Sequence, residues 1–467
     1  MTAPEWIQEA VFYHIFPDRF ANGDPANDPP NVQPWGAPPQ VTGFQGGDLR
    51  GVMQRFEYLL DLGVNALYFN PIFLSSSNHR YNTYDYFRID PKLGTLEDFR
   101  ALLNLAHRHG VRVVLDGVFN HCGRGFFAFA DVLENGEDSP YRDWFHIHRF
   151  PVDAFSPGKA QDYEAWWGYK SLPKFNTDTP AVRAYIFSVA RYWLEQGIDG
   201  WRLDVPNEID DDAFWAQFRR VVKEVNPRAA LIGEIWDINP RWANETHFDG
   251  LMNYPVRKAL LAYLNGEMGT QRFAESIEAV VRAYRPANLH AMYLPLGSHD
   301  TPRLWTLLGG DMDKVKLAFA FQFAFPGAPA VYYGDEIGLP GESDPDCRRA
   351  FPWDAPETWQ HALRAWVRRL IALRRDSVAL RRGAYRLVLA DDHRRLLAFV
   401  RQHPEESVLV VFNPGRLART VCLPARELGW EEGRRLYDML GDDGHRFEVR
   451  DGCVEIQAGA NEVLWLR

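Results

Sequence analysis

The sequence predicts an α/β fold followed by an all-β domain, and three observations support this. From about residue 11 to residue 374, short apolar runs typical of buried strands alternate with helical patterns. An irregular, aromatic and proline-containing segment interrupts the alternation once, over residues 122–179. After about residue 383, helical patterns give way to short alternating strands. A chain of 467 residues in this order is typical of a (β/α)₈ TIM barrel with an inserted loop domain after the third strand and a C-terminal β-sandwich; a doubly wound sheet is the alternative.

The individual elements follow from the hydrophobic periodicity. Barrel strands are predicted at residues 11–16, 64–69, 111–119, 198–205, 230–236, 250–253, 291–296 and 330–333. Helices are predicted at residues 49–62, 96–109, 181–196, 212–225, 272–284, 314–325 and 359–374, and with the eight strands we interpret them as the strand–helix units of a (β/α)₈ barrel. Strands of the last domain are predicted at residues 386–390, 395–401, 407–413, 420–423, 435–438, 453–456 and 462–466. The predicted domains are a barrel (1–121 and 180–382), a loop domain (122–179) and a sandwich (383–467).

Composition excludes several classes of function. The net charge is −10 with acids and bases interspersed, so neither nucleic acid nor an acidic membrane surface is a natural partner. No apolar run is long enough to span a bilayer, and Met1–Glu9 lacks a secretion signal, so we expect a cytoplasmic protein. The cysteines are scattered without metal-ligand spacing, which favours reduced thiols at Cys122, Cys347, Cys422 and Cys453.

Charged residues lie where the predicted barrel strands end. Arg202 and Asp204 are two residues apart on the fourth strand and share one face, and a structural ion pair would explain these two alone. Similar residues near strand ends are Asp116, Asn120 and His121 (third), Glu234 and Trp236 (fifth), and His299 and Asp300 (seventh). Because the C-terminal ends of barrel strands meet at one mouth, four carboxylates converge there. A like-charge cluster of this kind is typical of an active site.

Four segments of the chain resemble the signature segments of the α-amylase family of glycoside hydrolases. In family order they are Asp116-Gly-Val-Phe-Asn-His121, Gly200-Trp-Arg-Leu-Asp204, Gly233-Glu234-Ile-Trp236 and Ser298-His-Asp300. Leu172-Pro-Lys-Phe-Asn176 is similar to the fifth segment of the neopullulanase, cyclomaltodextrinase and maltogenic amylase subgroup. Val205-Pro-Asn-Glu208 is similar to the Val-Ala-Asn-Glu of that subgroup, with Pro206 as the departure. The resemblance covers essentially the whole chain, and its implied fold agrees with the pattern above.

Two carboxyls with opposed protonation are what a retaining glycosidase requires. We expect Asp204 to stay ionised beside Arg202 and to act as the nucleophile. We expect Glu234, between apolar neighbours, to have a raised pKa and to act as the general acid/base. The resemblance gives Asp300 the role of binding sugar hydroxyls and stabilising the distorted sugar. Asp116 is interpreted as a structural partner of Arg202.

Further residues are implied to bind substrate. By resemblance, Tyr81 stacks on the sugar at the cut, Asp344 and Arg348 lie at the non-reducing end, and Glu208 and Trp236 lie on the acceptor side. The full predicted substrate-binding set is Tyr81, His121, Arg202, Glu208, Trp236, His299, Asp344 and Arg348. Either histidine alone would be explained as a buried residue capping a strand end. Trp166 and Trp167 are weaker candidates for stacking or packing.

A loop near the start of the chain is rich in oxygen side chains. Residues 22–28 read Asn-Gly-Asp-Pro-Ala-Asn-Asp, and Gly-Gly-Asp follows at residues 46–48. An ordinary turn would explain the first motif, whereas hard cations require clustered oxygen ligands. The subgroup carries calcium at this pattern, so the resemblance implies calcium held by Asn22, Asp24, Asn27, Asp28, Gly46 and Asp48.

The chain differs from most members of the subgroup at the N-terminus. Most members carry a β-rich N-terminal domain that forms their dimer, whereas the first barrel strand here starts near Val11. We therefore expect a monomer, or a dimer that is not built through that domain.

The predicted activity is endo-type, retaining hydrolysis of α-1,4-glucosidic bonds in cyclodextrins, maltooligosaccharides, pullulan or starch, with some transglycosylation. The alternatives are an α-glucosidase, an oligo-1,6-glucosidase or a glucanotransferase of the same family. A third possibility, a non-catalytic carbohydrate-binding or transporter-associated relative, conflicts with the presence of Asp204, Glu234 and Asp300.

Overall fold

The centre of the molecule is a closed parallel barrel. The computed structural model describes residues 3–441 and 446–467. The barrel strands are β1 (Phe12–Ile15), β2 (Ala66–Phe69), β5 (Arg112–Gly117), β6 (Gly200–Leu203), β7 (Ala230–Gly233), β8 (Gly250–Leu251), β9 (Tyr293–Pro295) and β10 (Ala328–Tyr332). They form one 8-stranded sheet in the order β8-β7-β6-β5-β2-β1-β10-β9. A parallel bridge between Met252 and Tyr293 joins the two end strands, which confirms the predicted barrel.

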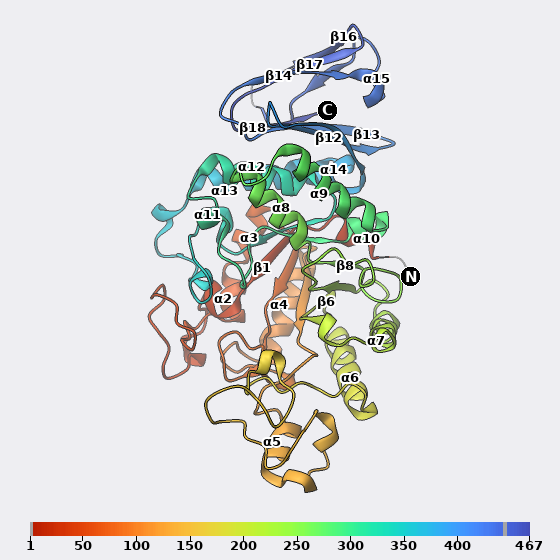
Figure 1. Ribbon diagram of the computed structural model, residues 1–467. Coiled ribbons are helices and arrows are strands. Elements are labelled where there is room, and N and C mark those ends of the chain that lie inside the picture. The colour runs from red at the N-terminus through yellow and green to blue at the C-terminus, as the bar shows by residue number, and fades with distance from the viewer. Residues whose placement is uncertain (1–2, 442–445) are drawn as a thin grey trace.

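Helices surround the barrel (Figure 1). They are α1 (Pro17–Phe20), α2 (Leu49–Gln54), α3 (Phe56–Leu62), α4 (Leu96–Arg108), α6 (Pro180–Gln196), α7 (Asp212–Val225), α8 (Tyr254–Leu264), α9 (Thr270–Ala283), α10 (Pro286–His290), α11 (Leu304–Leu307), α12 (Met312–Ala324), α13 (His361–Asp376) and α14 (Val378–Arg382). None of the helices in the described part of the chain is long and apolar enough to cross a bilayer.

The helices of the structure differ from a regular strand–helix repeat in several places. The predicted helix at residues 49–62 is broken at Arg55, whose φ of −99° and ψ of 12° are not helical. A loop rather than a helix joins β7 to β8, so the strand–helix repeat is not regular. Helix α8 was missed, although its start carries two recognisable signals: the Asn253 side chain accepts from Val256 N, and Pro255 lies in the first turn.

Two insertions build walls around one end of the barrel. The antiparallel strands β3 (Phe73–Ser75) and β4 (Thr83–Ile89) follow β2, and the loop between them carries Tyr81. The segment after β5 contains α5 (Phe127–Asn135) and otherwise short 3₁₀ turns and isolated bridges. One of those bridges pairs His121 with Lys174, so both ends of this segment are held beside the end of β5.

The C-terminal residues form two packed antiparallel sheets, which confirms the predicted sandwich. The first sheet contains β11 (Ala384–Asp391), β12 (Leu396–His403), β13 (Glu406–Asn413) and β18 (Glu462–Leu466). The second contains β14 (Arg419–Pro424), β17 (Cys453–Ala458), β16 (Arg446–Arg450) and β15 (Arg435–Tyr437). The first sheet is apolar on both faces, because Leu409 packs inside the sandwich whereas Val410 belongs to the core of the barrel unit. Strand β16 was not predicted; its Arg446-Phe-Glu-Val-Arg450 sequence carries only two apolar residues.

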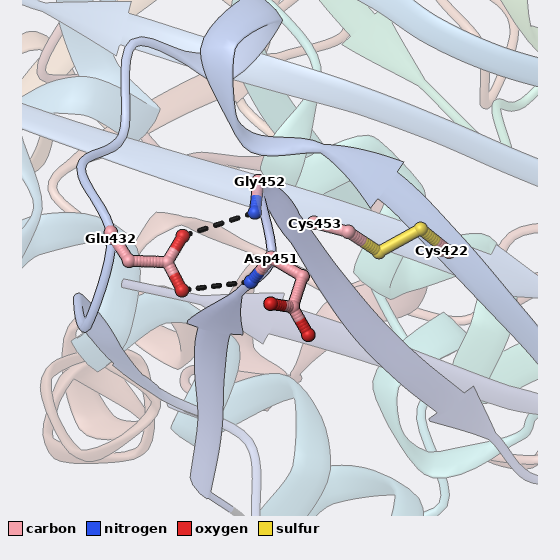
Figure 2. Close-up of a disulfide and its surroundings, with 5 residues drawn as sticks. All are labelled: Cys422, Glu432, Asp451, Gly452 and Cys453. Atoms are coloured by element: carbon pink, nitrogen blue, oxygen red, sulfur yellow. Dashed lines mark hydrogen bonds between the residues drawn. A yellow bond between two sulfur atoms is a disulfide. The ribbon is translucent and has the colours of Figure 1, made fainter.

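The structure corrects the expectation of four reduced thiols. Cys422 and Cys453 form a disulfide, shown in Figure 2, whereas Cys122 and Cys347 are free and buried. The bonded residues lie on the paired strands β14 and β17, where Cys422 stands opposite Glu455 and Cys453 stands opposite Pro424. Their separation of 31 residues gave no sign of this pairing, because it depends on the register of two strands within one sheet.

Candidate active site

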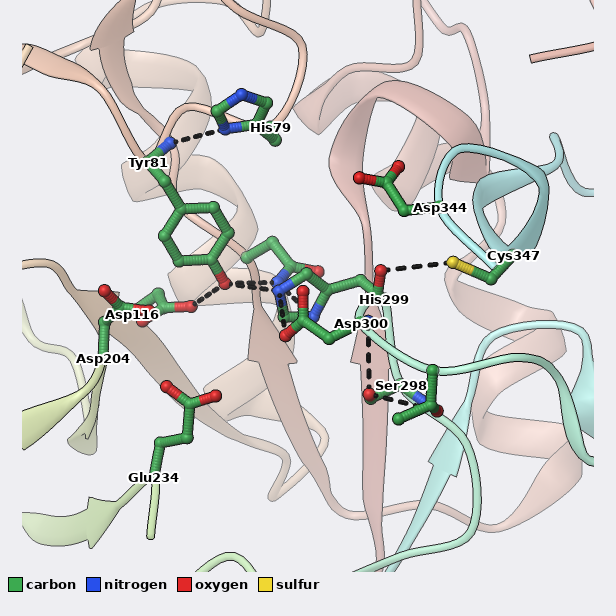
Figure 3. Close-up of polar contacts among 12 residues, drawn as sticks. His79, Tyr81, Asp116, Asp204, Glu234, Ser298, His299, Asp300, Asp344 and Cys347 are labelled. Carbon is green, nitrogen blue, oxygen red and sulfur yellow. Dashed lines mark hydrogen bonds and ion pairs between the residues drawn. The ribbon is translucent and has the colours of Figure 1, made fainter. Parts of the chain in front are cut away.

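The polar residues predicted at the strand ends meet at the mouth of the barrel. They come from β5 (Asp116), from β6 and the residue after it (Arg202, Asp204), from the residue after β7 (Glu234) and from the loop after β9 (His299, Asp300). Figure 3 shows the carboxyl groups of Asp204, Glu234 and Asp300 directed toward a common space beside Tyr81. The barrel therefore brings together side chains that are almost two hundred residues apart in the sequence.

Arg202 links the carboxylates of three strands. Its Nη1 lies 2.8 Å from Asp116 Oδ1 and 3.1 Å from Asp204 Oδ1, and its Nη2 lies 3.0 Å from Glu234 Oε2. The guanidinium is 1% exposed, so water screens these contacts little. Asp204 and Glu234 are consequently adjacent, each held by one terminal nitrogen of the same cation.

The backbone after Asp204 is strained and takes part in the site. Val205 has a φ of 35°, a left-handed conformation that β-branched residues rarely adopt. In this conformation its N–H donates to Glu234 Oε2 at 2.9 Å. Backbone strain is typically retained where it positions functional groups, and here it directs the Val205 amide, after β6, at the Glu234 carboxyl, after β7.

Burial raises the pKa of both adjacent acids. It raises the pKa of Asp204 well above the usual range, and the Glu234 carboxylate adds to this effect while Arg202 opposes it. Burial likewise raises the pKa of Glu234, again opposed by Arg202. We expected Arg202 to keep Asp204 ionised, but its Nη1 also binds both oxygens of Asp116, at 2.8 and 3.0 Å. Two adjacent acids with raised pKa values favour a state in which the pair holds one proton.

The pKa of Asp300 is shifted in the opposite direction, to a lower value. Burial alone would raise its pKa, but His299 and Arg348 outweigh burial and lower it. His299 Nε2 lies 3.0 Å from Asp300 Oδ2, and Arg348 Nη2 lies 3.5 Å from Asp300 Oδ1. Arg348 also pairs with Asp344 at 3.0 Å, so the structure brings these predicted residues together. Asp300 is therefore an anion that faces the neighbouring acid pair.

Tyr81 contacts both Asp116 and His299. Its hydroxyl donates to Asp116 Oδ2 at 2.7 Å and lies 2.7 Å from His299 Nε2. The two rings are nearly parallel, with centroids 5.3 Å apart and an interplanar angle of 8°. The neighbouring Arg80 is fully buried and pairs with Asp90 at 2.7 Å, which anchors the loop that carries Tyr81.

The remaining predicted residues surround the acids at the rim. His121 Nε2 is buried and has no hydrogen-bond partner among the described residues, and the ring stacks on Trp166 at 5.6 Å. Trp166 stacks in turn on Trp167, which is 70% exposed. Burial lowers the pKa of His121 to about 3, so the ring is neutral. These aromatic faces and the free nitrogen suit the binding of a sugar.

Of the two acceptor-side candidates, Trp236 contacts Glu234 and Glu208 contacts Lys174. Trp236 donates from Nε1 to Glu234 Oε1 at 3.3 Å. Its ring, 46% exposed, stacks on Tyr254 at 3.6 Å. Glu208 is half-buried and lies 3.7 Å from Lys174 Nζ, which belongs to the segment at residues 172–176.

The oxygen-rich loop fits a cation in part. Asn22 Oδ1 and Asn27 Oδ1 are buried without a hydrogen-bond partner among the described residues, and the Asp28 carboxylate accepts from Asn22 Nδ2 at 3.0 Å. A Cβ on Gly46 would lie 2.2 Å from Asp28 Oδ1, so the close approach requires glycine. Asp48 accepts from Gly51 N and caps α2, and the predicted ligand Asp24 is bound by Arg50 at 2.8 Å. Within residues 3–441 and 446–467, no three His, Cys, Asp or Glu side chains surround a metal position, so amide oxygens would be the main ligands.

Several residues of the site were missed by sequence reasoning. Asn70 follows β2 and contacts both Tyr81 and His299, each at 3.0 Å. His14 lies on β1 and contacts Asn70 at 2.8 Å. The available signal was their place at the mouth end of predicted strands, but neither belongs to one of the segments that carried the resemblance.

Comparisons with known proteins agree with this geometry. A family model described as the alpha amylase catalytic domain matches residues 14–369. Neopullulanase 2 of Thermoactinomyces vulgaris is 46% identical over 448 residues, covering 95% of this chain and 75% of that protein. The intracellular maltogenic amylase of Bacillus subtilis is 41% identical, with 93% and 73% covered. The solved structure of a cyclic α-maltosyl-(1→6)-maltose hydrolase from Arthrobacter globiformis, in complex with that sugar, is 38% identical, has a TM-score of 0.90 and covers 100% of both chains.

Proposed function

Since the chain belongs to the α-amylase family of glycoside hydrolases, we propose that it cleaves α-1,4-glucosidic bonds by an endo-type, retaining mechanism. Its substrates are cyclodextrins, maltooligosaccharides, pullulan or starch, and part of the product arises by transfer to sugar acceptors. The observation that carries the proposal is the adjacency of Asp204 and Glu234 on one buried guanidinium. A close pair of carboxyls is typical of retaining glycosidases, in which one of the two attacks the sugar directly.

The roles follow from the contacts of each acid. Glu234 is placed to protonate the departing oxygen, because Val205 N–H and Trp236 Nε1–H hold its side chain in place. Asp204 then attacks the anomeric carbon and forms a covalent β-glycosyl intermediate. Glu234, now a base, activates the water that releases the α-product. Asp300 stays anionic beside His299 and binds sugar hydroxyls while the positive charge develops.

This mechanism predicts a single anomeric outcome. An α-linked substrate is expected to give α-product first, because two successive displacements at one carbon restore its configuration. Proton NMR of the first turnovers measures this directly. Added glucose or maltose is expected to yield transfer products, since Trp236 and Glu208 offer an acceptor site beside the intermediate. An initial β-anomer would mean inversion and would require new roles for Asp204 and Glu234.

A second candidate activity concerns α-1,6 bonds. The Arthrobacter protein whose structure matches both chains over their full length is named for a cyclic sugar that contains an α-1,6 bond. The neopullulanase relative, in contrast, is matched over 75% of its length. Comparing kcat/KM for a cyclodextrin, pullulan, starch and cyclic α-maltosyl-(1→6)-maltose decides which substrate this site prefers.

We also propose that calcium stabilises the loop formed by residues 22–28 and 46–48. The support is the pair of unpartnered amide oxygens of Asn22 and Asn27 beside the Asp28 carboxylate, which suit a hard cation. The ion would fasten the loop and take no part in the chemical step, because these residues lie outside the group of contacts around Arg202.

Calcium is expected to raise the melting temperature without being required for turnover. A ligand that binds only the native state stabilises it by about 2.7 kcal/mol at one hundred times its Kd. Thermal unfolding with and without a chelator measures the effect. The Asp28→Ala variant should lose the calcium response, whereas Asp24→Ala, whose carboxylate binds Arg50, should keep it. If chelation leaves the wild-type melting temperature unchanged, the loop binds no calcium.

Two further proposals concern location and assembly. We propose a cytoplasmic location, supported by the relative that is named an intracellular maltogenic amylase. Detection of the protein in the cytosolic fraction of its source cells tests this location. We propose a monomer or a dimer, which light scattering of the purified protein distinguishes.

A further inference from the structure

Four side chains form a continuous chain of polar contacts from β1 to Asp300. His14 Nε2 lies 2.8 Å from Asn70 Oδ1, and Asn70 Nδ2 lies 3.0 Å from His299 Nδ1. His299 Nε2 then lies 3.0 Å from Asp300 Oδ2. His14 is fully buried and Asn70 and His299 are each 1% exposed, so water does not compete for these contacts.

Two carboxylates, Asp300 in this chain and Asp116 beside Tyr81, determine which atoms of the network carry protons. Tyr81 must donate its hydroxyl proton to Asp116 Oδ2, at 2.7 Å, because an ionised carboxylate only accepts. His299 Nε2 faces Asp300 and the same tyrosine oxygen, so this nitrogen must carry a proton as well. Asn70 Nδ2 can only donate, so His299 Nδ1, 3.0 Å away, is the acceptor and carries no proton.

The orientation of the Asn70 amide therefore has to be enforced, because the flipped amide would present its oxygen to His299 Nδ1. His14 enforces it. Burial lowers the pKa of His14 well below its usual range, so its ring is neutral and carries one N–H. His14 Nδ1 has no hydrogen-bond partner among the described residues, which suits a bare nitrogen and leaves the N–H on Nε2, facing Asn70 Oδ1.

We propose that His14 and Asn70 are positioning residues for Asp300: His14 holds the Asn70 amide, and this amide keeps His299 in the tautomer that donates Nε2–H to the carboxylate. The inference rests on the proposed function only for the role of Asp300 toward the sugar. Neither His14 nor Asn70 contacts the reacting carboxyls, and both act through His299.

The ionisable groups that face His299 come from every element packed against it. His14 comes from β1, and Tyr81, with His79 stacked on it, comes from the loop after β3. Asp116 and Arg202 reach His299 through the Tyr81 hydroxyl. Asp300 contacts the ring directly, and Arg348 and Cys347 both donate to the His299 carbonyl. The proposal requires that removing His14 changes the protonation of His299 within this fixed surrounding.

The decisive variants are His14→Leu and His14→Gln. In His14→Leu the Asn70 amide loses the contact that holds its oxygen and keeps only the one to Tyr81, so it can flip and accept from His299 Nδ1. His299 can then donate to Asp300 only as an imidazolium, and histidine loses its second proton between about pH 5 and 8. We expect kcat/KM of His14→Leu to fall about tenfold for each pH unit above that titration, a loss absent from the wild type. His14→Gln keeps an N–H donor and should restore the wild-type profile.

A second measurement reads the tautomer without using activity. ¹⁵N-labelled histidine NMR distinguishes imidazoles protonated at Nδ1, at Nε2 or at both, and a His299→Gln spectrum assigns the signal. The wild type and His14→Gln should show His299 with its proton on Nε2 near neutral pH. Asn70→Asp, which can only accept from Nδ1, should show a doubly protonated ring and serves if His14→Leu does not fold.

His290 provides the matched control, because it is a buried histidine whose two nitrogens contact main-chain oxygens of Pro286 and Gly383, away from the site. His290→Leu should leave the signal of His299 and the pH profile unchanged. Wild-type His299 with its proton on Nδ1, or a folded His14→Leu with wild-type tautomer and profile, overturns the proposal. A chain without α-glucan activity would overturn the proposed function instead, since the NMR result stands by itself.

Discussion

Replacing Asp204 by Asn is expected to abolish hydrolysis, with kcat reduced by about 10⁴-fold or more. Asparagine keeps the shape of the side chain and can still accept from Arg202 Nη1, which lies 3.1 Å from Asp204 Oδ1. It is a poor nucleophile, so the covalent intermediate does not form. Steady-state release of reducing sugar from a cyclodextrin measures the loss, and circular dichroism checks the fold.

Asp199→Asn is the matched control for this change. Asp199 directly precedes β6, at its opposite end, and pairs with Arg112 and His107, both at 2.8 Å. Its loss should lower stability and leave kcat near the wild-type value. If Asp204→Asn retained more than about a hundredth of the wild-type kcat, the assignment of the nucleophile would be wrong.

Glu234→Gln is expected to lower kcat on natural substrates by about 10²–10⁴-fold. The physical reason is that the departing sugar oxygen then leaves without a proton. A substrate whose leaving group needs no proton, such as α-maltosyl fluoride, should form the intermediate at a rate much closer to that of the wild type. Comparing kcat/KM of wild type and variant on the fluoride and on a maltooligosaccharide measures this difference.

The same comparison separates the two acids. Asp204→Asn should not be rescued by the fluoride, because the step that fails there is the attack on the sugar and not the departure of the leaving group. Equal losses on both substrates for Glu234→Gln would contradict its role as the general acid.

The sequence predicted the residues that strands place directly and missed those that depend on side-chain networks. Asp204 and Glu234 immediately follow β6 and β7, so knowing the strands was sufficient to bring them together. The ionisation of Asp204 was harder to judge, because Arg202, which was expected to keep it ionised, also binds Asp116 and Glu234. His14 and Asn70 were missed because a lone histidine and a lone asparagine near strand ends carry no pattern.

The outer domain shows a similar limit. Two-residue alternation predicted most of its strands, but Arg446–Arg450 was missed because its apolar content is low and its partner strand supplies the pairing. The Cys422–Cys453 disulfide likewise depends on the register between β14 and β17. Both features are set by contacts between segments distant in sequence, which local pattern does not contain.

The sharing of Arg202 among Asp116, Asp204 and Glu234 has a consequence for how this mouth can change through evolution. If any one of these carboxylates is removed, Arg202 interacts with the remaining two alone, which changes their pKa values. Substitutions at the three positions should therefore show strong epistasis, with the effect of one depending on the residues present at the others. A relative that has lost a single member of the group would be expected to carry compensating changes at its partners, and restoring the lost acid alone would not restore activity.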